Sequence, residues 1–193
     1  MKLPVIKLMQ REEELIRTLN LKSRIEAFKH SSQITCKSGC SSCCYRRIDI
    51  SLLEAIILLA EIKRTGKWRI VRERIKEHPS LKMSLDPETW ASLKMMCPVN
   101  DSGKCLGYAN RPVSCSSRFS RVDAKFCDPH IPESIPDGIF DVTLGVQMLA
   151  KYEAAHGVVH KMPIPEALLL AESIFSKEYS TIEEIIEAIK GAR

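Results

Sequence analysis

The chain has 193 residues, of which 45% are hydrophobic and 27% charged, and its formal net charge is +5. These values are those of an ordinary globular protein and exclude the collagen-like, low-complexity and disordered classes. The length fits one domain over residues 1–193, large enough to bury a real core. The mild basic excess permits an anionic partner without requiring one.

The longest apolar run, from Leu52 to Ala60, is interrupted by Glu54 and is far too short to span a bilayer. Near the N-terminal end, charged residues such as Lys7 and Arg11 break up the apolar positions, so no secretory signal is recognisable. We therefore expect a cytoplasmic protein without a membrane segment. In that reducing compartment, the 8 cysteines of the chain indicate metal or redox chemistry rather than disulfides.

Helical periodicity dominates the chain and predicts a mostly α fold in a single domain. Ser51 and Glu54 form a capping box that predicts a helix start at residue 52, and this helix is expected to run past Gly66. Asp86 and Pro87 are typical of an N-cap followed by the first helical position. The predicted helices cover residues 5–28, 52–76, 87–95, 140–155, 167–177 and 181–190.

Two segments, residues 35–50 and 97–136, have no clear period and are rich in Cys, Ser, Gly, Pro and Arg. The second is unusually long for a loop in a compact domain, so something other than its own secondary structure must order it. All 8 cysteines lie in or at the edges of these two segments. We therefore expect a cysteine-cluster core over residues 36–127, in which metal organises two irregular loops.

The candidate metal ligands are Cys36, Cys40, Cys43, Cys44, Cys97, Cys105, Cys115 and Cys127. A Cys-x-x-Cys pair such as Cys40 and Cys43 lets two thiolates converge on one ion within a tight turn. Adjacent side chains such as those of Cys43 and Cys44 seldom point at one centre. Either one of these two ligates and the other packs, or the block faces two centres.

Two arrangements fit this spacing. In the first, four thiolates from both segments hold a cubane 4Fe–4S cluster. In the second, two groups of four thiolates hold two tetrahedral zinc ions. Either centre is anionic, and basic side chains close in sequence could offset its charge. These side chains are Lys37, Arg46, Arg47, Lys104, Arg111, Arg118 and Arg121. Buried structural thiols without metal, and disulfide bonds, are the less favoured alternatives.

The cysteines belong to a longer pattern: Cys36-x3-Cys40-x2-Cys43-Cys44, then Cys97-Pro98, Cys105, Tyr108, Arg111-Pro112-x2-Cys115 and Phe119. Over about residues 36–127 this pattern resembles the YkgJ-type cysteine-cluster family. The resemblance implies a zinc- or iron-chelating domain, often assigned as an iron–sulfur oxidoreductase, in which all eight cysteines have counterparts. A similar cysteine block occurs in flagellin lysine methylases, which carry a 4Fe–4S cluster.

Two positions depart from the family pattern. Gly107 stands where an aliphatic residue usually precedes the tyrosine, and Ser116 stands where an arginine often follows the last cysteine of the motif. These departures affect the surroundings of the expected ligands and leave the ligands themselves unchanged.

Histidines and a basic segment have weaker interpretations. His130 could complete a mixed site, and His156 and His160 would share one helix face if that region were helical. Residues 63–76 hold many basic side chains around Trp68. We interpret this segment as a solvated helix face rather than a nucleic acid site, because no nucleic acid-binding motif is complete.

The Cys36-x3-Cys40-x2-Cys43 spacing also matches that of radical SAM enzymes, but the chain lacks the alternating strands and helices of a barrel. We therefore predict a metal-binding protein that carries an iron–sulfur cluster with a role in redox chemistry or protein modification. The alternative is a structural zinc module that mediates interaction with a protein or nucleic acid. A protein partner or substrate fits either function, whereas we expect no membrane partner.

Overall fold

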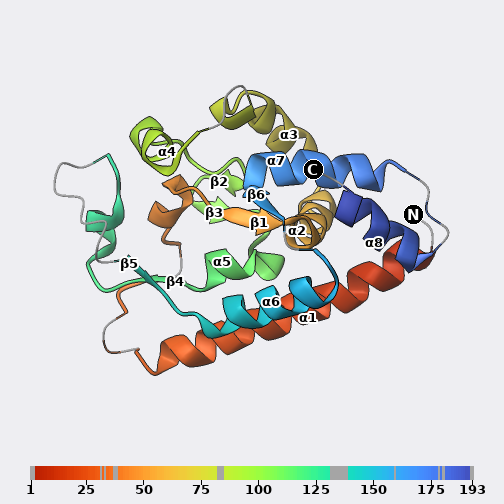
Figure 1. Ribbon diagram of the computed structural model, residues 1–193. Coiled ribbons are helices and arrows are strands. Elements are labelled where there is room, and N and C mark those ends of the chain that lie inside the picture. Colours follow the sequence, from red (N-terminus) through yellow and green to blue (C-terminus); the bar gives the residue numbers. More distant parts are fainter. Residues whose placement is uncertain are drawn as a thin grey trace.

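A computed structural model describes residues 3–30, 32, 34–36, 39–81, 85–130, 139–158, 160–177, 179 and 181–191 (Figure 1). The fold is mostly helical, as predicted. The α-helices are α1 Leu3–Phe28, α2 Leu52–Arg64, α3 Trp68–Lys76, α4 Pro87–Leu93, α5 Val113–Ser116, α6 Leu144–Ala155, α7 Ile164–Phe175 and α8 Ile182–Gly191.

Short 3-10 helices and strands connect these helices. The 3-10 helices are η2 Ser42–Tyr45, η3 Pro79–Leu81, η4 Tyr108–Asn110 and η5 Ala124–Cys127. The strands form antiparallel pairs, β1 with β6, β2 with β3 and β4 with β5. Their bounds are β1 Asp49–Ser51, β2 Asn100–Asp101, β3 Lys104–Cys105, β4 Arg118–Ser120, β5 Ile139–Asp141 and β6 Lys161–Pro163.

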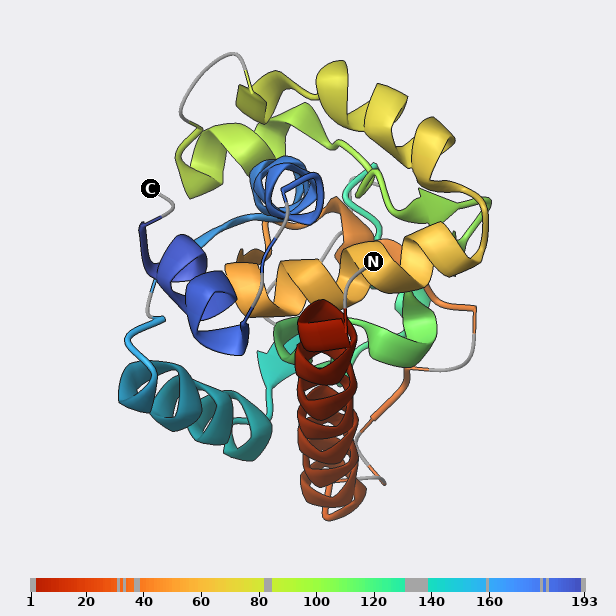
Figure 2. The ribbon, with the colours of Figure 1, turned by 90° about the vertical axis from the view of Figure 1, so that its right-hand side faces the viewer.

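Helix α2 is the centre of the hydrophobic core. It is apolar around almost its whole circumference, which is typical of a helix buried on all sides. It packs against α7, and the core between them includes Leu59, Ile62, Leu168 and Ala171. Helix α1 lies across the other side of α2 and packs against both α6 and α5, which also contact each other (Figure 2). The cysteine-bearing segments lie in the half of the molecule away from α8 (Figure 1).

The capping box at the start of α2 is confirmed. The Ser51 hydroxyl accepts from the Glu54 N–H at 3.2 Å, and the Glu54 carboxylate accepts from the Ser51 N–H at 3.0 Å. The N-cap at Asp86 is confirmed too, because its carboxylate accepts from the N–H groups of Glu88 and Thr89. Both helices therefore begin where their capping side chains predicted.

The prediction of one helix over residues 52–76 is wrong. Helix α2 ends at Arg64, and Gly66 has a φ of +71° before α3 begins at Trp68. Glycine reaches this left-handed region without steric cost, so it ends one helix and turns the chain into the next.

Two other helix starts differ from their predictions. Residues 139–141 form strand β5 and pair with β4, so α6 begins only at Leu144. Helix α7 begins at Ile164, earlier than predicted, because Pro165 lies in its first turn, where a helix needs no N–H donor. The irregular segments contain η2, α5 and the short strands, whose length gives no periodicity to detect. Residues 131–138 of the second segment lie outside the described residues.

Among the described residues, no helix is both long enough and apolar enough to cross a membrane.

Candidate metal centre

The turn η2 carries the first cysteine block. Its backbone closes through the Cys44 N–H, which donates to the Ser41 carbonyl at 2.9 Å. The Cys44 carbonyl then accepts from the Cys97 N–H at 2.8 Å. This bond joins the two irregular segments at the backbone, so both segments present their cysteines to the same region.

The hairpin of β2 and β3 carries Cys105. Asn100, at the start of this hairpin, accepts from the Gly103 N–H at 3.0 Å and so closes its turn. The side-chain amide of Asn100 donates to the Cys44 sulfur at 3.5 Å. A hydrogen bond to sulfur stabilises the anionic form of the thiol and tunes a metal held by it. Sequence reasoning missed Asn100, which no spacing rule singles out.

Helix α5 carries Cys115 and is held by buried polar groups. The Glu54 carboxylate, which also completes the capping box, accepts from the Val113 N–H at 2.8 Å. The Asn20 amide donates to the Arg111 carbonyl at 3.0 Å, and the Ser116 hydroxyl donates to the Asn20 side-chain oxygen. Three elements, α1, α2 and α5, thus fix the position of Cys115.

The two departures from the family pattern have structural reasons. A Cβ atom at Gly107 would lie 2.2 Å from Cδ1 of the buried Leu58, so η4 approaches α2 more closely than a side chain allows. Ser116 is fully buried and bonds to Asn20 on α1, where a long charged side chain would have no room. Both positions adapt the segment around Cys115 to the helices packed against it.

Six of the cysteines line one cavity of about 370 Å³. The cavity lies between η2, the β2–β3 hairpin, η4, α5 and the first turn of α7. Its cysteines are Cys40, Cys43, Cys44, Cys97, Cys105 and Cys115. The structure thus places cysteines of both segments along one cavity, and the neighbours Cys43 and Cys44 are both among them.

Cys43 is the electrostatic centre of this group. A hydrogen bond with Cys44, together with burial, raises the pKa of the Cys43 thiol well above its usual range. Burial raises the pKa of Cys97 to about 12, and Cys105 and Cys43 contribute as neighbouring thiols. Burial, Cys97, Cys105 and Cys43 likewise raise the pKa of Cys115. These four thiols disfavour one another's ionisation, which a bound cationic centre would relieve.

Cys36 and Cys127 lie outside the lining of the cavity and meet at Ser120 on β4. The Ser120 N–H donates to the Cys36 sulfur at 3.1 Å, and the Cys127 thiol donates to the Ser120 hydroxyl at 3.1 Å. Burial raises the pKa of the Cys36 thiol, and the nearby thiols of Cys40 and Cys43 raise it further. The two cysteines therefore form a second group beside the cavity. Ser120, which links them, was not predicted.

Six cysteines line a cavity rather than a ready-made metal site. In the part of the chain that the structure describes, no three or more His, Cys, Asp or Glu side chains are arranged to hold a single metal ion. All eight cysteines are free thiols. Cysteine sulfurs, N–H groups that donate to sulfur and nearby cations are nevertheless the groups that iron–sulfur and zinc centres use in proteins.

The weaker candidates lie elsewhere. His130 contacts Asp128 at 3.0 Å and stacks edge-on against Tyr45, away from the cavity lining. Helix α6 ends at Ala155, so His156 and His160 do not share a helix face. The Trp68 indole donates to the Glu172 carboxylate at 2.7 Å, so this ring packs against α7 and is not free to stack on a base.

Comparisons of the chain with protein-family models, with curated proteins and with solved structures found no match.

Proposed function

We propose that the protein is a cytoplasmic metalloprotein that carries a 4Fe–4S cluster in the six-cysteine cavity and serves in redox chemistry or protein modification. The observation that supports the proposal best is that cysteines from two segments, more than fifty residues apart at Cys43 and Cys97, line one cavity. The free state of all eight thiols fits a reducing compartment.

The size of the cavity favours a cluster over a single zinc ion. Four sulfurs bound to one zinc each lie about 2.3 Å from the metal and leave no space between them. The cavity of about 370 Å³ instead suits an inorganic group with several metal atoms. Its four central thiols, Cys43, Cys97, Cys105 and Cys115, match the number that a cubane cluster needs.

The chain's own residues would hold and tune this group. When bound, a 4Fe–4S cluster supplies one-electron transfer at a potential that its surroundings set. Asn100 donates a hydrogen bond to the sulfur of Cys44, beside the four proposed ligands. Leu58, Ile48 and Ile164 line the same cavity and reduce the access of water.

The proposal is tested by purifying the full chain without oxygen and measuring visible absorption, iron, sulfide and zinc. We expect a brown protein with iron and sulfide, and Cys43→Ser and Cys115→Ser variants that lose most of both. Cys127→Ser is the matched control, because this cysteine lies outside the cavity lining, and it should keep its iron.

The outcomes separate the alternatives. A colourless protein with stoichiometric zinc would replace the cluster by the structural zinc module. Protein without metal, whose Cys43→Ser and Cys115→Ser variants melt as the wild type does, would contradict metal binding altogether. Equal loss of iron in Cys127→Ser would overturn the assignment of the four ligands.

A further inference from the structure

Most of the cations that line the six-cysteine cavity have no anionic partner among the described residues. Four cations line it, namely Arg46, Lys104, Arg111 and Arg118, and none of the described lining residues is an Asp or Glu. Arg118 is engaged outside the cavity, since its guanidinium makes two bonds of 2.9 Å to the Asp141 carboxylate. Within the described residues, Arg46, Lys104 and Arg111 form no ion pair with a carboxylate.

A buried donor faces the same shortage of acceptors. Trp90 lines the cavity and is only 6% exposed, and its indole N–H is buried without a hydrogen-bond partner among the described residues. A buried donor without an acceptor costs about 1–3 kcal/mol, so such groups usually mark a missing ligand or water. The described lining residues therefore offer no acceptor to the Trp90 indole N–H, although burial keeps this group away from bulk water.

At least one of these cations lies where an entering molecule would meet it. Lys104 is exposed and Tyr108 is 52% exposed, which places both at the open side of the cavity. The Arg111 guanidinium lies 4.5 Å from the centre of the Tyr108 ring, so its orientation is fixed by a cation–π contact. Deeper walls are apolar and include Ile48, Val99 and Ile164.

We propose that this cavity binds a small organic oxyanion, a molecule with a carboxylate or phosphate group on an apolar body, as the substrate or ligand of the metal centre. The oxyanion would accept hydrogen bonds from Arg46, Lys104, Arg111 and the Trp90 indole. Arginine forks and lysine suit both kinds of oxyanion. The apolar body would lie against Ile48 and Ile164. This inference names the substrate class of the proposed function and rests on it.

A simpler role for the cations would be to balance the charge of the thiolates. The two roles differ in what a substitution removes. A cation that only balances the centre contributes to metal content or reduction potential, whereas a cation that binds the oxyanion contributes to the affinity for that oxyanion. The experiment therefore measures both in the same samples.

The test uses the anaerobically purified, metal-loaded full chain at constant ionic strength. It is titrated with phenyl phosphate, benzoate and inorganic phosphate, and with benzyl alcohol as the uncharged analogue. Calorimetry gives the affinity, and tryptophan fluorescence reports on Trp90. We expect saturable binding of phenyl phosphate or benzoate, weaker binding of inorganic phosphate and none of benzyl alcohol. Trp90→Phe should lose the fluorescence change, although Trp68 remains.

Arg46→Gln and Lys104→Gln should each lower the oxyanion affinity about tenfold or more while visible absorption and iron content stay unchanged. Lys22→Gln is the matched control, because Lys22 is a half-buried cation on α1 outside the cavity lining, and it should bind as the wild type does. If one of the two cavity variants also loses iron, the oxyanion affinity of the other variant decides whether the cations bind the oxyanion.

Absence of saturable binding, equal binding of benzyl alcohol, or an equal loss of affinity in Lys22→Gln would overturn the inference. Loss of iron in both cavity variants with unchanged oxyanion affinity would show that the cations only balance charge. A metal-free wild type would defeat the proposed function, whereas an iron-loaded protein that binds no oxyanion would defeat this inference alone.

Discussion

Glu54 joins two structural tasks in one side chain. One carboxylate oxygen accepts from the Ser51 N–H and starts α2, and the other accepts from the Val113 N–H and positions α5 with Cys115. The side chain is 1% exposed, and burial raises the pKa of its carboxyl group to about 7, although both N–H donors act in the opposite direction. The buried Glu153, whose pKa burial also raises, adds to this effect.

The elevated pKa of Glu54 predicts that the protein becomes less stable as the pH rises from 5 to 8. Between its ordinary pKa near 4.5 and its folded pKa near 7, the folded state binds more protons than the unfolded state. The stabilisation is complete below the lower value and is lost as the pH rises through the higher one. Its size is on the order of 3 kcal/mol. Denaturant unfolding at several pH values measures it.

The Glu54→Gln variant provides the control for this prediction. Glutamine cannot ionise, and its NH2 group opposes one of the two backbone donors, so the variant should be less stable at pH 5. The difference from the wild type should narrow as the pH rises to 8. Parallel stability curves for the two proteins would contradict the assigned cause.

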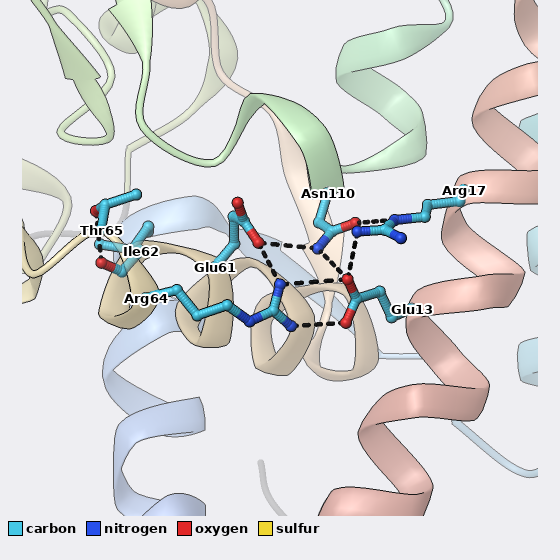
Figure 3. A network of polar contacts seen from close by, with 7 residues as sticks. All are labelled: Glu13, Arg17, Glu61, Ile62, Arg64, Thr65 and Asn110. Carbon is cyan, nitrogen blue, oxygen red and sulfur yellow. Dashed lines mark hydrogen bonds and ion pairs between the residues drawn. The ribbon is translucent and has the colours of Figure 1, made fainter.

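At the scale of elements, a polar network joins α1, α2 and η4 (Figure 3). The buried Asn110 amide donates to the carboxylates of Glu13 and Glu61 at 2.9 and 3.1 Å, and its oxygen accepts from Arg17 at 3.0 Å. Arg64 closes the network by binding both carboxylates. Asn110 directly precedes the Arg111-Pro112 pair, so this network holds the segment that leads to Cys115.

Removal of the Asn110 side chain should loosen this segment. Asn110→Ala leaves three hydrogen bonds unmade in a buried position, and we expect a loss of about 2–3 kcal/mol in the free energy of unfolding. Iron retention during dialysis should fall as well, because α5 is less firmly placed. Thr65→Ala is the control in the same region, since among the described residues its hydroxyl bonds only to the Ile62 carbonyl at the end of α2 (Figure 3). A loss no larger than that of Thr65→Ala would contradict the role of the network.

The starts of α2 and α4 were predictable because their capping signals are local. The Ser51 and Glu54 capping box and the Asp86 N-cap mark starts that the structure confirms. The short strands were not predictable, because β4 and β5 owe their existence to a partner far along the chain rather than to their own residues. Gly66 carried the signal for a helix end, but a single glycine within a periodic pattern is compatible with both outcomes.

The sequence indicated which cysteines to examine, but not how the fold arranges them. Spacing indicated the cysteines, whereas their division between the cavity and Ser120 depends on tertiary packing. Asn100, Ser120 and Asn110 gave no signal of their own, because a buried hydrogen bond between distant residues leaves no pattern along the sequence. Glu54 did give a signal, as part of the capping box, but only for its local task.

The whole molecule consists of a helical core and a cysteine region with little apolar packing of its own. Helices α2 and α7 supply much of the core, whereas residues 97–120 contribute few fully buried apolar side chains. Elements of this kind open locally at lower cost than the core does. A metal centre held by both cysteine segments would raise the local stability of these residues.

Metal removal should therefore affect the helical core and the cysteine region differently. Anaerobic chelation is expected to speed amide hydrogen exchange over residues 97–120 about tenfold or more, which corresponds to about 1.4 kcal/mol of local stability. Exchange in α2 and α7 should change little. Mass spectrometry of exchanged peptides measures both regions in one sample. Uniform acceleration throughout the chain would show that the metal stabilises the whole fold rather than this region.

The pairing of β1 with β6 affects when such a centre is assembled in the cell. Strand β1 follows directly on η2, but its partner strand and Ile164, which forms part of the cavity wall, are translated long after both cysteine segments. Until the ribosome has released these later residues, the thiols have no enclosed space to share. We therefore expect any iron–sulfur centre of the kind proposed to be assembled after translation, and a ribosome-bound fragment ending before β6 to leave its thiols open to oxidation.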